Sequence, residues 1–206
     1  MEIFINNEKI DFNFNEQELI GSAVNTISSK LKKENRVLCQ IKIDNVTIPE
    51  AKENEIFSFP LGSIKQMDLK AETVENLVLN SLESLNLLLP ELIKAINKTA
   101  DLHREGDERA AKNLFFTTLE AMEIVPAILT NIRATMNLEF EHIKHGDSNL
   151  KGLEEGMLSA ISLIYEAQKN EDYVTLADVL EYELSPNLSS WFDAIPVLKK
   201  RCNGKD

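Results

Sequence analysis

The histidines and acidic residues are the first candidates for metal chemistry in this chain of 206 residues. Glu139 and His142 lie three residues apart, the spacing with which one helix supplies two ligands to a carboxylate-bridged metal pair. Such a centre also needs a second Glu-x-x-His pair and two further glutamates. His103 and His145 have no glutamate three residues before them. The sequence therefore does not predict a di-iron centre.

A smaller metal site is a second interpretation of the same region. His142, His145 and Asp147 have a spacing that suits a surface metal. We favour an interpretation without metal, because histidines in the last turn of a helix interact favourably with the helix dipole. We therefore predict no metal ligands and no cofactor.

Nucleophilic and phosphate chemistry have little support in the sequence. The two cysteines, Cys39 and Cys202, have no histidine nearby in sequence, and no Gly-x-Ser-x-Gly motif occurs. The seven glycines form none of the spaced phosphate-binding motifs. Distant residues can meet in a fold, so enzyme activity stays open, but we predict no catalytic and no cofactor-binding residues.

Large aromatic residues in the C-terminal part are the candidates for contact with a partner: Phe116, Tyr173, Tyr182 and Trp191. The last three lie in a segment rich in acidic residues, which predicts an acidic, aromatic-rimmed groove for a partner's amphipathic helix. Trp191 has a second interpretation, in which it fills the core of a helical bundle. Phe116 points about 100° away from its neighbour Phe115 on a helix and is expected to be partly exposed.

Composition narrows the class of partner. The chain has 22 Lys and Arg against 34 Asp and Glu, a net charge of −12, which disfavours nucleic acid and anionic membranes. No window approaches the roughly 18 consecutive apolar residues of a membrane span. The N-terminus lacks the basic start and apolar stretch of a secretory signal. We therefore expect a cytoplasmic protein that binds neither nucleic acid nor membranes.

The character of the sequence changes between Lys70 and Thr73, which predicts two domains, residues 1–72 and 73–206. The first part has mostly period-2 patterns, with strands expected at 1–5, 10–14, 36–43, 46–48, 55–59 and 64–69. One helix is expected after Asn15, which can act as its N-cap with Glu18 as the capping-box partner.

The order hairpin, helix and returning strands resembles a β-grasp, or ubiquitin-like, domain. Met1–Ile5, Arg36-Val37-Leu38 and the closing strand at 64–70 fit that layout. No Gly-Gly tail follows the last strand, so the resemblance implies an interaction module rather than a conjugated tag.

The second part has long segments of helical period. Thr73 can cap the first helix, which has an apolar stripe from Val78 to Ile96 and stops at Gly106. Asp107 caps the second, whose pattern continues through Phe140 and Ile143 until Gly146. The third is expected to begin at Asp147-Ser148, and Asp172 caps the fourth, which carries Trp191.

Four amphipathic helices joined by short loops predict an antiparallel four-helix bundle. Internal prolines should kink or locally break its helices: Pro90, Pro126, Pro186 and Pro196. The predicted fold is thus α+β, with a small β-grasp-like domain followed by a proline-kinked bundle.

The acidic bundle is similar to the flagellin export chaperones. The likeness rests on the Gly106-Asp107 turn, the Asp172 cap and the late Trp191. That resemblance implies a cytosolic bundle that wraps the helical ends of an aggregation-prone client.

These patterns predict a non-catalytic adaptor or export-chaperone-like protein whose bundle binds an amphipathic or basic protein partner. The alternative is a small enzyme or ligand-binding protein with a site in the cleft between the two domains. The bundle seam could also form a homodimer.

Overall fold

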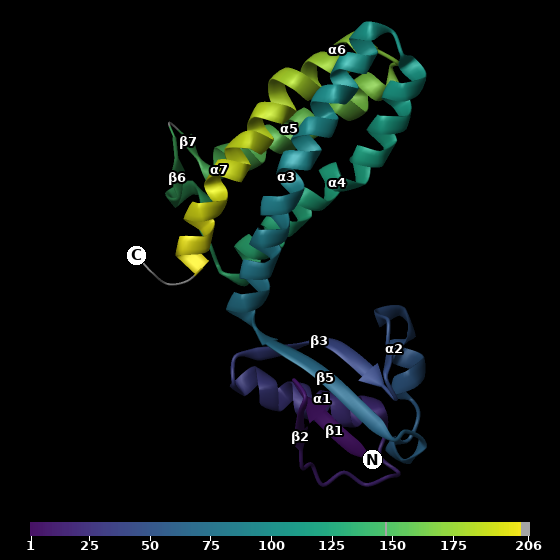
Figure 1. Ribbon diagram of the computed structural model, residues 1–206. Coiled ribbons are helices and arrows are strands. Elements are labelled where there is room, and N and C mark those ends of the chain that lie inside the picture. Colours follow the sequence, from purple (N-terminus) through teal and green to yellow (C-terminus); the bar gives the residue numbers. More distant parts are fainter. Residues whose placement is uncertain (147, 203–206) are drawn as a thin grey trace. The chain divides into compact units, whose positions relative to one another are not determined.

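The computed structural model describes residues 1–146 and 148–202 (Figure 1). The protein is α+β, as predicted, with a small mixed sheet in its N-terminal part and about six helices. The chain divides into two compact units, Met1–Leu77 and Val78–Asp206. The division falls in the first turn of helix α3 (Val74–Glu105).

The N-terminal unit is a five-stranded sheet with two helices. Its strands are β1 (Glu2–Ile5), β2 (Glu8–Ile10), β3 (Arg36–Ile43), β4 (Val46–Thr47) and β5 (Gln66–Thr73). Their order in the sheet is β2-β1-β5-β3-β4, with β1 and β5 parallel and the other neighbours antiparallel. Helix α1 (Ile20–Lys33) covers one face of this sheet (Figure 1).

The core of this unit lies between α1 and the sheet. Alternate residues of β5 are buried, because successive side chains of a strand point to opposite faces. Ile27 of α1 and Met67 of β5 are fully buried there. The intervening residues of β5 face away from α1.

Three predictions for this unit were wrong. The segment expected as a strand at 55–59 falls largely within helix α2 (Glu50–Phe57), where Glu50 and Glu53 in the first turn suit the positive end of the helix dipole. The second strand ends at Ile10 rather than at position 14. Helix α1 begins at Ile20, so Asn15 is not its N-cap.

Asn15 and Glu18 nevertheless form the contacts that suggested a cap. The Asn15 backbone N–H donates to Glu18 Oε1 at 3.0 Å, and the Asn15 side chain accepts from the Gln17 N–H at 3.0 Å. These contacts close a separate turn before the helix. The residue that flanks α1, Leu19, makes no side-chain cap.

The second unit is helical. Besides α3, it contains α4 (Glu108–Thr135), α5 (Leu150–Lys169), α6 (Tyr173–Asp178) and α7 (Ser185–Cys202). A π-helical segment, Val179–Leu184, joins α6 to α7. Asp107 and Asp172 cap α4 and α6 as predicted, each accepting from a backbone N–H three residues on.

Contacts between side chains define which helices lie side by side. Helix α3 runs antiparallel to the α6–α7 segment, because Glu83 forms an ion pair with Lys199 and Arg104 forms one with Asp178. Antiparallel pairing of α4 with α5 is marked by Glu123 with Tyr165 and by Arg133 with Glu154. Figure 1 shows these four stretches running along one another.

Helix α4 is shorter than predicted. It ends at Thr135, and Asn137 has a positive φ of 49° that an α-helix does not accommodate. A short 3-10 turn, Phe140–His142, and a hairpin of β6 (Lys144–His145) with β7 (Ser148–Asn149) follow. Phe140 and Ile143 are buried although they lie outside the helix. Their apolar spacing therefore reflects burial in the core and not a helical backbone.

The start of α5 also differs from the prediction. Asn149 is its N-cap and accepts from the Gly152 N–H at 2.9 Å. Asp147, which was expected to help begin this helix, lies outside the described residues.

At three of the four internal prolines the helix is not broken. Pro90, Pro126 and Pro196 lie inside helices that continue through them. Pro186 stands in the first turn of α7, directly after the π-helical segment. The expected breaks therefore do not occur at Pro90, Pro126 and Pro196, and the expected kinks there stay a prediction.

Within the described residues, α4 is also the helix long and apolar enough to cross a membrane by length and composition. Core helices of soluble proteins meet the same criterion. Helix α4 packs Phe115, Met122 and Leu129 into the core of the helical unit.

Candidate functional site

Three of the four predicted contact residues remain accessible. Phe116 on α4 is 63% exposed, Tyr182 in the π-helical segment is 64% exposed, and Tyr173 at the start of α6 is half-buried. Trp191 on α7 is 1% exposed, and its ring lies 5.8 Å from that of Phe140, centroid to centroid. The Trp191 ring is therefore part of the core in this conformation and offers no surface to a partner.

Tyr173 is held in a stack of side chains from three helices. Its ring lies parallel to that of His103 on α3, with centroids 5.1 Å apart. Lys112 of α4 places its Nζ 4.9 Å from the centre of the Tyr173 ring. The hydrogen bond with Tyr173 raises the pKa of the Lys112 ammonium. The stack therefore fixes the start of α6 against α3 and α4.

His103 is the unusual member of this stack. Neither of its ring nitrogens has a hydrogen-bond partner among the described residues, although both are inaccessible to solvent. Burial lowers the pKa of His103, and Lys112 lowers it further, against the opposing effect of Glu108. These surroundings therefore favour the neutral form of the ring over the charged form.

Arg104, the next residue on α3, links the stack to the π-helical segment. Its guanidinium donates to Glu181 and, at 3.0 Å, to Asp178. The same group lies 5.5 Å from the centre of the Tyr182 ring. Hydrogen bonds to Glu181 and then Asp178 raise the pKa of Arg104. One cation thus contacts two carboxylates and the ring of the exposed Tyr182.

A small hollow of about 80 Å³ lies between these groups, and Val174 on its rim is 74% exposed. We call the surface formed by Tyr173, Val174, Asp178, Glu181 and Tyr182 the acidic aromatic end. Phe116 is exposed on α4, where its ring contacts that of Phe115, and it is not counted in this surface. Sequence reasoning missed Val174, His103 and Arg104. Val174, Asp178 and Tyr182 are spaced by four residues, which places them on one helical face. This spacing is the sequence signal that could have identified Val174.

The chain segments around this surface are strongly acidic. Residues 101–112 and 166–183 contain ten acidic residues: Asp101, Glu105, Asp107, Glu108, Glu166, Glu171, Asp172, Asp178, Glu181 and Glu183. They contain four basic residues: Arg104, Arg109, Lys112 and Lys169. The resulting net charge of −6 is half of the chain's −12, so the segments that carry exposed Val174 and Tyr182 are much more acidic than the rest of the chain.

The π-helical segment, Val179–Leu184, lies at this site. Helices of this type are rare and occur frequently at functional sites. Here the segment holds Glu181 and Tyr182 at the surface while Val179, Leu180 and Leu184 are buried. The irregular backbone therefore coincides with the exposed aromatic and acidic side chains.

The predicted metal candidates do not converge. No group of three or more His, Cys, Asp and Glu side chains in 1–146 and 148–202 is arranged to hold a metal ion. His142 Nε2 lies 3.3 Å from Glu139 Oε2 in an exposed pair. His142 sits in a 3-10 turn and His145 in β6, so neither lies in the last turn of α4 as expected. Asp147 is outside the described residues.

Both cysteines are free thiols. Cys39 of β3 is exposed, and its Sγ donates to the Lys70 carbonyl at 3.3 Å. Cys202 is buried, and burial raises the pKa of its thiol. A buried neutral thiol is a poor nucleophile.

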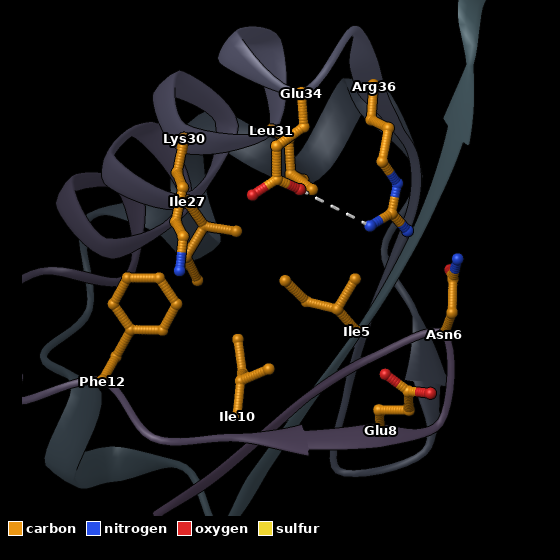
Figure 2. Close-up of a pocket in the computed structure, with 10 residues that line it drawn as sticks. All are labelled: Ile5, Asn6, Glu8, Ile10, Phe12, Ile27, Lys30, Leu31, Glu34 and Arg36. Atoms are coloured by element: carbon orange, nitrogen blue, oxygen red, sulfur yellow. Dashed lines mark ion pairs between the residues drawn. The ribbon is translucent and has the colours of Figure 1, made fainter.

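A second concave site lies in the N-terminal unit, between the β1–β2 hairpin and α1 (Figure 2). It has a volume of about 350 Å³. Its apolar lining consists of Ile5, Ile10, Phe12, Ile27 and Leu31. Its polar rim consists of Asn6, Glu8, Lys30, Glu34 and Arg36. We call it the hairpin hollow.

Together, the fold and these two sites describe an α+β protein with a mixed-sheet unit, a helical unit and one concave or apolar surface on each. Residues 80–194, more than half of the chain, match the family described as domain of unknown function DUF8042, and the chain belongs to that family. Residues 1–73 match the family described as TP0873 N-terminal domain. Comparisons with curated proteins and with solved structures found no significant match.

Proposed function

We propose that the protein is a non-catalytic interaction module of the adaptor or export-chaperone type, and that its acidic aromatic end binds an amphipathic, basic segment of a protein partner. The observation that carries the proposal is the coincidence of exposed Val174 and Tyr182 with segments that hold half of the chain's net negative charge. Aromatic side chains in such positions supply much of the affinity of protein interfaces.

The chemistry of this surface favours a basic partner helix. Apolar residues spaced along one face of such a helix could cover Val174 and the Tyr182 ring. Its Lys or Arg side chains would face Asp178 and Glu181, which Arg104 neutralises only in part. The surrounding negative field would also accelerate association with a positively charged segment.

The fold assignments from sequence belong to the same proposal. We propose that the helical unit is an antiparallel four-helix bundle, supported by the pairing of α3 with α6–α7 and of α4 with α5. We propose a β-grasp-like N-terminal unit, supported by its order of hairpin, helix and returning strands. We also propose a cytoplasmic location. As another arrangement, we propose that two copies of the chain associate through the helical unit as a homodimer.

A pull-down of the tagged full-length chain from its native host lysate tests the proposed function. The wild type is compared with Val174→Asp and with Leu87→Asp, both on exposed apolar positions of the helical unit. Leu87 lies on α3 about 25 Å along the helix from Arg104, so it serves as the matched control. We expect one partner at near-equal stoichiometry, retained by Leu87→Asp and reduced at least tenfold by Val174→Asp.

The partner should also be released as salt is raised, because exposed charges are screened. A partner that binds Val174→Asp as well as the wild type would contradict the proposal. So would a partner lost equally from both variants.

A further inference from the structure

The hairpin hollow has the size and lining of a ligand site. Its volume of about 350 Å³ lies at the lower end of the range of about 300–1,000 Å³ found for small-molecule sites. Ile27 and Leu31 of α1 are buried at its base. Ile5, Ile10 and Phe12 are only partly buried around it. Apolar surface thus remains uncovered at this point of the core.

The charges around the hairpin hollow are distributed unevenly. Figure 2 shows Lys30 beside Phe12 on one side, and Glu8 and Asn6 on the other. Arg36 lies on that second side too, 3.8 Å from Glu34. Lys30 forms no ion pair with any described residue, and its Nζ lies 5.1 Å from the centre of the Phe12 ring. The one unneutralised cation therefore stands at one end of an apolar floor.

We infer that the hairpin hollow binds a small free monocarboxylate with an aliphatic body, a site separate from the acidic aromatic end. The carboxylate would accept from Lys30 Nζ, since a charge-assisted hydrogen bond is stronger than the exposed contact of Lys30 with the Phe12 ring. The aliphatic body would cover Ile5, Ile10 and Ile27. Glu8 would repel the carboxylate from the other end and so orient the ligand.

Octanoate is the probe, and 1-octanol is its neutral counterpart. Both are titrated into the full-length chain by calorimetry, with isoleucine methyl groups observed by NMR. We expect saturable 1:1 binding of octanoate, with methyl shifts at Ile5, Ile10 and Ile27. Binding of octanol should be at least tenfold weaker, because it lacks the charge that Lys30 recognises.

Two variants with equal net charge test whether octanoate is bound by Lys30 itself or attracted by the overall charge of the protein. Lys30→Met should weaken octanoate binding about tenfold and leave octanol unchanged. Lys32→Met removes a charge from the same last turn of α1 but not from the hollow, and should bind octanoate like the wild type.

Three results would overturn the inference: no saturable binding of octanoate, equal effects of the two lysine variants, or methyl shifts confined to the helical unit. Because the acidic aromatic end plays no part in this experiment, its outcome does not depend on the proposed partner interaction.

Discussion

The two units of this chain bury their apolar surface in different ways. Among the described residues, the core of the helical unit has thirty buried members, with Trp191 and Phe140 among the largest, whereas the core of the N-terminal unit has twelve. The smaller unit leaves Ile5, Ile10 and Phe12 partly uncovered around a hollow. The helical unit instead exposes apolar residues at its acidic aromatic end. The smaller core is therefore found beside a hollow of about 350 Å³, and the hollow at the acidic aromatic end of the larger one is about 80 Å³.

The largest effect is expected at the centre of the larger core. Trp191→Ala should destabilise the helical unit by about 3–5 kcal/mol, the usual loss for truncating a buried aromatic residue. Urea unfolding followed by far-UV circular dichroism measures this loss. The exposed Leu87→Ala is the control and should change the free energy of unfolding by less than about 0.5 kcal/mol.

The same variant tests whether the units are independent. Methyl signals of Ile27 and Ile41 report on the N-terminal unit and should keep their wild-type unfolding midpoint in Trp191→Ala. A matching shift of both transitions would show that the units unfold as one, and the comparison between them would fail.

Two helical glycines sharpen the comparison of packing. A Cβ on Gly21 of α1 would lie 2.9 Å from the Phe57 Cβ, whereas one on Gly156 of α5 would meet the end of the Asn187 side chain at 3.0 Å. Gly21→Ala should therefore destabilise the N-terminal unit by about 1–2 kcal/mol, despite the better helix propensity of alanine. Gly156→Ala should stay within about 0.5 kcal/mol of the wild type, because the better helix propensity of alanine offsets the weakening of the hydrogen bond that Asn187 Nδ2 donates to the Leu153 carbonyl.

Thermal unfolding of each glycine variant checks these values. If Gly21→Ala were more stable than the wild type, α2 would be able to shift away from the new Cβ at little cost. The packing of α1 against α2 would then be no tighter than the packing around Gly156.

A smaller effect is expected for the residues that cap helices. Asp172 accepts from the Thr175 N–H at 3.0 Å and from its hydroxyl at 2.7 Å, and these bonds lower the pKa of Asp172. Asp172→Ala should cost about 1 kcal/mol. Asn15→Ala should cost less, since Asn15 caps no helix. An equal loss for both variants, measured by urea unfolding, would show that the turn at Asn15 matters as much as a true cap.

The pair also illustrates what the sequence could predict. Asp107 and Asp172 were identified correctly because each precedes a long segment of helical period. Asn15 has the same local chemistry, but four more residues pass before α1 begins at Ile20. Local hydrogen bonding can therefore be read from the sequence, whereas the start of a helix depends on where its apolar face meets the sheet.

Tertiary burial explains the other differences. Phe140 and Ile143 continued the apolar period of α4 because the core needs them, although the backbone leaves the helix before them. For the candidate site, the sequence identified Tyr173 and Tyr182. It could not identify His103 or Arg104, because their contacts join residues about 70 positions apart in the chain.

The last prediction concerns pH and again separates the units, since all three histidines lie in the helical unit. The pKa of His103 is lower in the folded state than its ordinary value of about 6.5, so the unfolded chain binds the proton more readily. The stability of the helical unit should therefore decrease as pH falls from above 6.5 towards the folded pKa, and should be insensitive to this group at higher pH.

The variant His103→Phe keeps an aromatic ring against Tyr173 and removes the group that titrates. The difference in free energy of unfolding between wild type and His103→Phe should shift against the wild type as pH falls from about 7 to 5.5. A difference that is constant with pH would mean that His103 takes up its proton without cost, and the stack with Tyr173 and Lys112 would then impose no constraint on its charge.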